Sequence, residues 1–418
     1  MNVLMRNGQD LSSIRLPRWG RVAPVEGAPV PWCVIDPDGS PVWPIERFLG
    51  DFSIGNSPGS VRSYAYALLR WWRWLQVVDV AWDRATSAEV RDLVLWLQAT
   101  QKQRRYPRTA SVATAGGVNP ITRKRNLSDR YEPSTIRHSN AVLASFYGFW
   151  IDIGEGPVVN PVPRDRRGGR RPNEHHNPLE PWRAEGRLRY NPKLPKRKPR
   201  AIPDTEWNSL FGALQSHRDR AILAVAVSNG ARASELLGMR AGVDLDWGEQ
   251  LVRVVRKGTR VEQWLPSSPE AFVWIRLYLA ELRAPLAPDE PLWQTLRRRR
   301  AGPALRRIPL TYGALRAVFR RVNALLGTNW TMHDLRHTAA LRMAADKSLS
   351  LRDIQVILGH THLSTTADVY LIEDENQVIR RVASYLADRE RRVALPPVPV
   401  ADGYDAADLT VLFGGEAQ

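Results

Sequence analysis

Six residues in the second half of the chain carry the side chains needed to cleave a phosphodiester without a metal. They are two arginines, a lysine, two histidines and a tyrosine, namely Arg232, Lys257, His333, Arg336, His360 and Tyr370. Arginine keeps its charge at any working pH, and its planar fork of donors matches phosphate oxygens. Lysine and histidine can transfer protons, and a tyrosine hydroxyl can act as a covalent nucleophile. The set therefore indicates attack by a tyrosine on a phosphate that positive charge holds in place.

A metal site is the alternative chemistry for two of these residues. His333 and His337 are four apart, which is the spacing of two zinc ligands on one helical face. The glutamate of the metalloprotease motif is absent, Asp334 stands in its place, and no third ligand is evident. His360 and His362 form a similar but weaker pair. We therefore expect neither a metal nor another cofactor, and we interpret His337 as a packed structural residue.

The composition indicates a protein that binds nucleic acid. The 418-residue chain has 60 lysines and arginines against 43 aspartates and glutamates, a net charge of +17. A protein with so large an excess of positive charge usually binds a polyanion, most often nucleic acid. An anionic membrane surface is the competing interpretation, but no lipidation motif, signal peptide or membrane-spanning stretch supports it. Cys33 is the single cysteine of the sequence, which excludes an intrachain disulfide and fits a reducing cytoplasm.

Helical periodicity dominates the parts of the chain that must position these side chains. Apolar residues keep one helical face from Tyr64 to Leu75. Thr86 and Glu89 form a capping-box signature in front of a second amphipathic stretch. Further helices are expected over 136–150, 204–214, 221–228, 268–283, 311–326, 333–345, 351–358 and 376–386.

A β-hairpin is expected where the helical pattern lapses. The β-rich runs 250–255 and 261–265 flank Lys257, which places that lysine in a turn. A lysine in a turn can swing its ammonium group toward a bound ligand. The arginine run 297–300 lies between predicted helices, and we expect it in a solvated loop.

Composition divides the chain into five segments. We expect an N-terminal arm or small module over 1–44, a helical DNA-binding domain over 45–160, a basic interdomain linker over 161–200, a catalytic domain over 201–394 and a tail over 395–418. The linker is rich in arginine, lysine and proline and has no periodicity. It is either a solvated spacer or a strap along a phosphate backbone. In the second case the contacts fall to Lys196, Arg197, Lys198 and Arg200.

Four segments of the second half resemble the catalytic domain of the tyrosine recombinases, the phage-type integrases. They are 229–236, with Arg232; 256–260, with Lys257; 333–338, with His333 and Arg336; and 358–370, with His360 and Tyr370. The likeness is strong over about residues 200–390, and residues 45–155 match the family only in pattern. The resemblance implies a mainly α fold with a small sheet or hairpin in the catalytic domain, arranged as a two-domain clamp on DNA.

By this resemblance, the cationic residues divide the work of cleavage. Arg232 and Arg336 would clamp the phosphate, and Lys257 would give a proton to the leaving 5′ oxygen. Glu235 is the acidic neighbour of this set. A carboxylate at the scissile phosphate would repel it, so we expect Glu235 to orient Arg232 or a neighbour.

The remaining roles fall to the two histidines and the tyrosine. His333 would handle the proton of the tyrosine hydroxyl, and His360 would donate a hydrogen bond to the phosphate. Tyr370 would attack and become a 3′-phosphotyrosine. It lies ten residues after His360, one more than is usual in the family. One residue turns a helical side chain by about 100°, so the turn before Tyr370 must absorb the difference.

The resemblance implies a site-specific DNA recombinase that acts on double-stranded DNA. Four protomers would hold two duplexes, and the free protein would be a monomer or weak oligomer. It would be cytoplasmic, associated with the nucleoid when on DNA, and would have no membrane partner. The alternatives are a type IB topoisomerase, a catalytically silent DNA-binding protein on the same fold, and a metallohydrolase that uses His333 and His337. The Leu-Gly-His segment and the intact set of six residues favour the recombinase.

Overall fold

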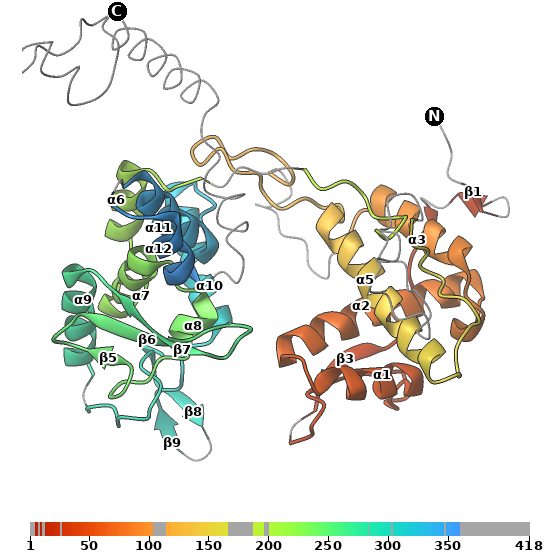
Figure 1. Cartoon of the computed structure of the whole chain (residues 1–418), viewed down its shortest axis with the longest axis horizontal. Helices are drawn as coiled ribbons and strands as arrows, with labels where there is room; N and C mark the ends of the chain where they lie inside the picture. Colours follow the sequence, from red (N-terminus) through yellow and green to blue (C-terminus); the bar gives the residue numbers. More distant parts are fainter. Residues whose placement is uncertain are drawn as a thin grey trace, which may run out of the picture. The chain divides into compact units, whose positions relative to one another are not determined.

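The chain folds into two compact units that are mainly helical and carry small antiparallel sheets (Figure 1). The computed structural model describes residues 5–6, 9–10, 13–25, 27–102, 114–165, 187–195, 200–282, 284–301, 304–346 and 348–359. Unit 1 spans Met1–Arg197 and unit 2 spans Lys198–Gln418. The predicted fold class, helical with small sheets, is confirmed. In the part of the chain described, no helix is long and apolar enough to cross a membrane.

Unit 1 is built on long helices whose starts are encoded by local capping residues. Ser57 accepts a hydrogen bond from the amide of Ser60, and Pro58 occupies the first helical position of the same helix. The capping box predicted for Thr86 and Glu89 is confirmed. The helices are α1 (Trp43–Ser53), α2 (Pro58–Val78), α3 (Ser87–Ala99) and α5 (Pro133–Asp152), with a short 3-10 turn, η2, at Trp82–Arg84.

The core of unit 1 is aromatic. Trp71, Trp74 and Trp150 have no exposed surface, although tryptophan is seldom fully buried. A buried indole N–H usually finds a partner, and those of Trp71 and Trp74 do. Trp71 Nε1 donates to Tyr147 Oη at 2.9 Å, and Tyr147 in turn donates to the carbonyl of Trp82 at 2.8 Å. This relay joins α2, α5 and the η2 turn across the core.

A short hairpin of the N-terminal segment belongs to this unit. Strands β3 (Arg21–Pro24) and β4 (Trp32–Ile35) pair antiparallel and pack against α2. Val34 is fully buried in the aromatic core. Arg73 of α2 donates to the carbonyls of Trp19 and Gly20 at 2.6 and 2.7 Å. The described part of segment 1–44 therefore packs with the helices of unit 1.

Parts of the predicted linker also contact unit 1. The amide of Asp165 donates to the carbonyl of Arg187 at 2.7 Å, so the two described ends of the segment lie side by side. Asn140 Nδ2 donates to Asn191 Oδ1 at 2.9 Å, and Tyr190 packs against the aromatic core. Of the proposed phosphate contacts, Arg200 is exposed, and residues 196–198 lie outside the described residues.

Unit 2 alternates helices with a three-stranded sheet. Its antiparallel order is β5-β6-β7, so the predicted hairpin is confirmed and gains a third strand. The helix expected over 376–386 lies outside the described residues. The elements are α6 (Asp204–Gly212), α7 (His217–Asn229), α8 (Ala233–Leu237), β5 (Leu245–Asp246), β6 (Leu251–Val255), β7 (Glu262–Pro266), α9 (Pro269–Ala280), β8 (Arg299–Ala301), β9 (Ala304–Arg306), α10 (Tyr312–Leu326), α11 (Met332–Ala345) and α12 (Leu351–Leu358).

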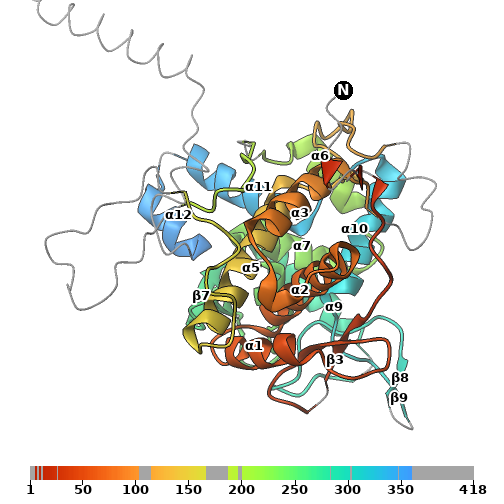
Figure 2. The same cartoon turned by 90° about the vertical axis from the view of Figure 1, so that its right-hand side faces the viewer.

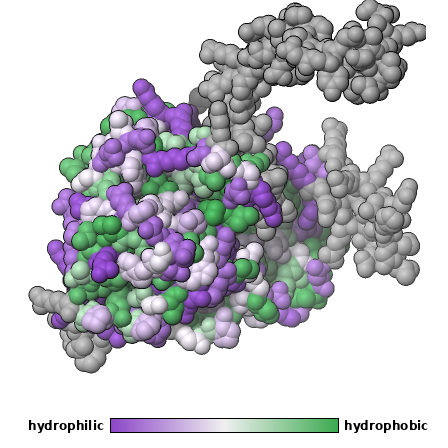
Figure 3. Space-filling view, turned by 60° about the vertical axis from the view of Figure 1, so that its left-hand side comes forward, coloured by the Kyte–Doolittle hydropathy of each residue, from purple (hydrophilic) through white to green (hydrophobic). Residues whose placement is uncertain are grey.

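The helix α7 lies at the centre of unit 2. It packs against both α9 and α11, and its residues 221–226 are buried, as expected of a helix that is apolar on all sides. Figure 3 shows hydrophilic and hydrophobic residues intermixed over the side of the protein where unit 2 comes forward. Because α7 is covered by other helices, its sequence needs no amphipathic pattern. The elements around it supply the polar surface of unit 2.

The arginine run 297–300 corrects one expectation. It was predicted to lie in a solvated loop, but Arg299 and Arg300 belong to β8, which pairs with β9. The register places Arg299 opposite Arg306. In Figures 1 and 2 this hairpin lies at the end of unit 2 that is remote from α6. The prediction failed because arginine has little strand preference of its own, so the run gave no strand signal although its partner β9 follows closely in the sequence.

Candidate active site

The loop between α7 and α8 carries Arg232. Gly230 ends α7 with φ of 68°, a left-handed conformation that favours glycine. A Cβ at this position would lie 2.8 Å from Leu358 Cδ2, so glycine also lets α12 approach the loop. The buried Asn229 accepts from the amide of Ala231 at 3.0 Å. These contacts fix the chain immediately before Arg232, which is the N-cap residue of α8.

Glu235 lies beneath Arg232 and gathers hydrogen bonds from two further segments. It is 3% exposed. Arg232 Nη1 and the amide of Lys257 donate to Oε1 at 2.9 and 3.1 Å. The amide of Arg232 and Arg256 Nη1 donate to Oε2 at 2.9 and 3.2 Å. Glu235 therefore connects α8 to the β6–β7 turn, and its carboxylate has no lone pair left for a substrate.

The protonation of Glu235 follows from the same contacts. Burial alone would raise the pKa of this carboxyl. The amide hydrogen bonds from Arg232 and Lys257, together with the Arg232 guanidinium, outweigh burial and lower the pKa below its ordinary value. The group is ionised at neutral pH, so it can orient cations but cannot donate a proton.

Lys257 begins the turn that joins β6 to β7. Its side chain is exposed, whereas its amide is held by Glu235. Gly258 and Arg260 have φ of 105° and 62°, and the amide of Arg256 donates to the carbonyl of Val261 at 2.8 Å, which closes the turn. The lysine side chain thus projects from a backbone whose position is fixed at both ends.

Arg336 is held by two backbone carbonyls from opposite sides of the site. It is 4% exposed. Its Nη1 donates to the carbonyl of Gly230 and its Nη2 to the carbonyl of Leu358, both at 2.7 Å. A guanidinium buried in this way is oriented by the fold and retains its charge, because the pKa of arginine is far above neutrality. Arg336 therefore connects α11 to the loop of Arg232 and to the end of α12.

His333 lies in the first turn of the same helix. The predicted common face of His333 and Arg336 belongs to α11, which starts at Thr331 with a capping box closed by Asp334. The His333 side chain is exposed, and its ring meets that of His337 edge-on with centroids 4.4 Å apart. Among the described residues no group of three or more His, Cys, Asp or Glu side chains could hold a metal ion.

His360 and Tyr370 lie outside the described residues. The described chain leads up to His360, since α12 ends at Leu358 and Gly359 has φ of 64°. Of the six predicted catalytic residues, the structure brings the segments of Arg232, Lys257 and Arg336 together through hydrogen bonds, with His333 one helical turn before Arg336.

The sequence reasoning missed Arg256. It is 4% exposed and lies between Glu235, Gln263 and the end of α12. Burial lowers its pKa, and the charge of Glu235 opposes that effect. The one signal in the sequence was spacing, since Arg256 follows Val252 and Val254 at alternate positions of a predicted strand, and in the structure these three residues are buried.

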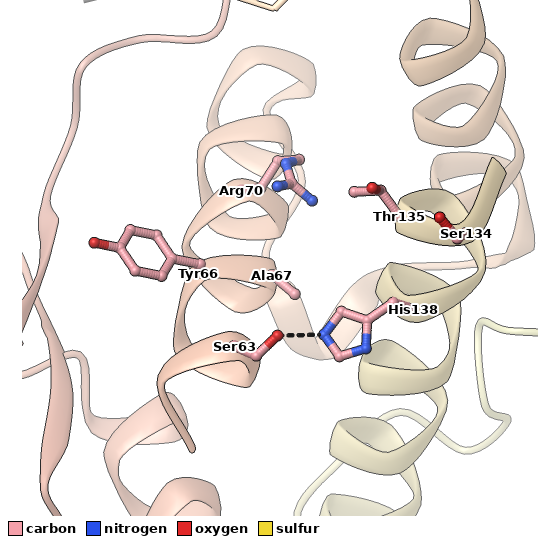
Figure 4. A pocket seen from close by; sticks show the side chains of 7 residues that line it. All are labelled: Ser63, Tyr66, Ala67, Arg70, Ser134, Thr135 and His138. Carbon is pink, nitrogen blue, oxygen red and sulfur yellow. Dashed lines mark hydrogen bonds between the residues drawn. The ribbon is translucent and has the colours of Figure 1, made fainter. Parts of the chain in front are cut away.

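The sequence reasoning also missed a polar hollow of about 310 Å³ in unit 1 (Figure 4). Two helices line it, with no carboxylate among the lining side chains. Ser63 Oγ and His138 Nε2 are 2.8 Å apart, and Arg70 lies over the ring of Tyr131 at 5.1 Å. The lining residues are Ser63, Tyr66, Ala67 and Arg70 of α2 and Ser134, Thr135 and His138 of α5. The signal on α2 was a stripe at helical spacing, but its partner helix lies far along the sequence.

Comparison with known proteins assigns a family to this geometry. Residues 201–377 match the model of the phage integrase family. Transposase A from transposon Tn554 of Staphylococcus aureus is 22% identical over 381 residues, which cover 88% of this chain and 98% of that protein. Tyrosine recombinase XerD of Xanthomonas axonopodis pv. citri is 32% identical over 184 residues, which cover 42% of this chain and 59% of that protein.

A solved structure supports the fold over most of the chain. The Tn1549 transposon integrase, in complex with circular intermediate DNA, matches with a TM-score of 0.52 at 14% identity. The match covers 81% of this chain and 98% of that chain. The family match falls on unit 2, where Arg232, Lys257, His333 and Arg336 lie. Unit 2 of this chain therefore carries a domain that matches the phage integrase family.

Proposed function

We propose that this protein is a site-specific DNA recombinase that cleaves and rejoins double-stranded DNA through a 3′-phosphotyrosine. The observation that carries the proposal is the hydrogen-bonded arrangement of unit 2, in which Glu235 connects the segments of Arg232 and Lys257, and Arg336 binds the loop just before Arg232. Such an arrangement supports the proposal because it would hold cationic residues close to one another before a substrate arrives. Preorganised charge of this kind is commonly the largest contribution to transition-state stabilisation.

In this proposal Tyr370 is the nucleophile of the cleavage step. Its Oη forms a bond to phosphorus while the bond from phosphorus to the 5′ oxygen breaks. The phenolic proton passes to His333, and a proton from the Lys257 ammonium group passes to the leaving oxygen. Arg232 and Arg336 neutralise the charge that develops on the phosphate, and His360 donates a further hydrogen bond.

The products of cleavage are a phosphotyrosine ester and a free 5′ hydroxyl. The ester conserves the energy of the broken bond, so the hydroxyl of a partner strand can reverse the step and restore a phosphodiester. The chemistry therefore requires neither a nucleotide cofactor nor a metal. We further propose that four protomers hold two duplexes during exchange, in the cytoplasm and on the nucleoid, and that the free protein is a monomer or weak oligomer.

Unit 1 would supply a second grip on the DNA. The hollow between α2 and α5 offers hydroxyls, an imidazole and a guanidinium, and such groups bind phosphates and base edges. The basic residues Lys196, Arg197, Lys198 and Arg200 would add contacts to phosphates. They lie where unit 1 gives way to unit 2, so they would follow the backbone between the two grips.

The test is strand exchange on DNA taken from both sides of the coding region. Two plasmid-borne copies of the flanking sequence are incubated with the full-length protein, with and without EDTA, and junctions are sequenced. We expect reciprocal exchange at one short sequence, unchanged by the chelator. Sequence-independent relaxation of a supercoiled plasmid without exchange would indicate a topoisomerase. Exchange lost in EDTA and restored by zinc or magnesium would indicate a metal enzyme.

A further inference from the structure

We propose that Arg256 is a positioning residue. Its single guanidinium group fixes the position of both Lys257 and the end of α12. Arg256 directly precedes Lys257, yet its side chain turns to the opposite side of the hairpin: Arg256 is 4% exposed and Lys257 is exposed. This inference rests on the proposed function, in which Lys257 protonates the leaving oxygen.

The guanidinium of Arg256 uses each of its three nitrogens on a different segment. Nε donates to Gln263 Oε1 on β7 at 2.8 Å, and Nη1 donates to Glu235 Oε2 on α8 at 3.2 Å. Nη2 donates to the carbonyl of Ile357 on α12. A planar fork with separate donors can satisfy this geometry, whereas the single ammonium of lysine cannot reach all of these acceptors in one plane.

Gln263 reinforces the connection to α12. Its Nε2 donates to the carbonyl of Val356 at 3.1 Å while its Oε1 accepts from Arg256. The last turn of a helix leaves carbonyls without partners inside the helix, and Arg256 donates to one of these, that of Ile357. Gln263 adds a second donor to the carbonyl of Val356, which also accepts from the amide of Gly359. The hairpin and the end of α12 are thereby held together by side chains of β6 and β7.

Gly359 shows how closely the chain passes Arg256. A Cβ at this position would lie 2.9 Å from Arg256 Nε and 3.0 Å from its Cζ, and φ is 64°. Both the conformation and the contact favour glycine. The guanidinium plane therefore supports the backbone at the last residue before His360.

Glu235 transmits the position of Arg256 to Lys257. Its Oε2 accepts from Arg256 and its Oε1 accepts from the Lys257 amide, so one carboxylate fixes two successive residues of the turn. Without Arg256 the carboxylate loses a buried cation and the turn loses its link to α12. A displacement of about 1 Å at a reacting group can cost about 10²-fold in rate.

A change of leaving group can separate misplacement of Lys257 from a general defect in folding. A bridging sulfur in place of the 5′ oxygen gives a thiolate, which leaves without a proton. The bond from Tyr370 Oη to phosphorus still forms and the phosphorus–sulfur bond breaks, so Lys257 is no longer needed. A variant whose defect is a misplaced Lys257 should therefore recover on the sulfur substrate, and a variant with a general folding defect should not.

The experiment measures single-turnover cleavage of a nicked target by the full chain, with the ordinary phosphate and with the 5′-phosphorothiolate. We expect Arg256→Met to cleave the phosphate about 10²-fold more slowly than wild type. On the phosphorothiolate Lys257→Ala should return close to the wild-type rate, and Arg256→Met should recover the part of its loss that comes from a misplaced Lys257, leaving only the part that comes from the end of α12. Arg253→Met is the matched control on β6, three residues before Arg256. Arg253 pairs with Asp244 and Glu262, and this variant should cleave both substrates like wild type.

Arg256→Lys guards against loss of the fold. Thermal unfolding is recorded for each variant, and if Arg256→Met does not fold, the same comparison is made with Arg256→Lys, which keeps the charge but loses the fork. Rescue of Lys257→Ala without rescue of the Arg256 variants would overturn the positioning role and leave the proposed function standing. Wild-type cleavage of both substrates by these variants would also overturn it. Failure to rescue Lys257→Ala would reject the proposed role of Lys257 and the inference with it.

Discussion

The two units differ in the kind of large side chain that each of them buries. Unit 1 buries aromatic rings, with Trp71, Trp74 and Trp150 fully enclosed, and none of its described arginines or lysines is buried. Unit 2 buries cations, since Arg218, Arg256 and Arg336 are each 4% exposed. Removing apolar area from water stabilises a fold, whereas burying a charge costs free energy that its partners must offset.

The difference shows where the fold accepts the free-energy cost of burying a charge in order to fix the position of a cationic side chain. Arg256 and Arg336 contact the segments that carry Arg232 and Lys257, and their partners are backbone carbonyls, the Gln263 side-chain amide and one carboxylate. An apolar side chain could fill such space at lower cost. Cations there fit the proposed cleavage chemistry, which needs fixed positive charge, whereas the aromatic core of unit 1 serves the fold.

The largest expected effect is on the stability of unit 1. Trp71→Ala removes a fully buried indole and the donor to Tyr147, so it should lower the free energy of unfolding of unit 1 by about 3–5 kcal/mol. Calorimetry on the full chain should show one transition shifted and the other in place. Trp293→Ala, which removes a buried indole of unit 2, should shift the other transition. A common shift in both variants would contradict two independent cores.

The next effect is on cleavage. Arg336→Met should lower the rate of strand cleavage by about 10²–10³-fold, because it removes a preorganised donor to the phosphate. Arg218→Met is the matched control, since Arg218 is equally buried but bonds to Asp219 and to the carbonyl of Gln294. It should lose stability and keep cleavage at equal folded fraction. Equal loss of cleavage in both variants would mean that buried charge serves the fold alone.

The local elements of both units could be predicted from the sequence. The contacts between segments that lie far apart in the sequence could not. Capping boxes, amphipathic faces and the hairpin are local signals, and they were confirmed at Thr86 and around Lys257. The site of Arg256 depends on carbonyls of α12 about one hundred residues away, which no local pattern encodes. The hollow of unit 1 likewise needs α2 and α5 to meet.

A smaller effect concerns pH and Glu235. The pKa of this carboxyl is lowered in the folded state, so its contribution to stability is present above the ordinary value of 4.5 and is lost as pH falls through the folded pKa. Glu235→Gln should destabilise unit 2 by about 1–3 kcal/mol at pH 7. Unfolding curves from pH 7 to pH 3 should converge for the two proteins at the acid end. If the difference in unfolding free energy between the two proteins were the same at every pH, Glu235 would not stabilise unit 2 through its ionised form.

The smallest effect is on DNA affinity. If Arg70 contacts one phosphate, Arg70→Gln should make the slope of log K against log salt shallower by about 0.9. Arg91→Gln on α3, where Arg91 pairs with Asp92, is the control and should leave the slope unchanged. Binding to target DNA is measured across a salt series for both variants. Identical slopes for wild type and Arg70→Gln would remove the hollow from the DNA-binding surface.

The most direct test of the central claim is to identify the residue that becomes attached to DNA. A nicked target traps the covalent complex, which is digested with protease and nuclease and mapped by mass spectrometry. The account predicts a phosphotyrosine at Tyr370, formed in EDTA and absent from Tyr370→Phe, which should still bind the target. An adduct on another residue such as Tyr385, or cleavage that leaves no adduct, would contradict it.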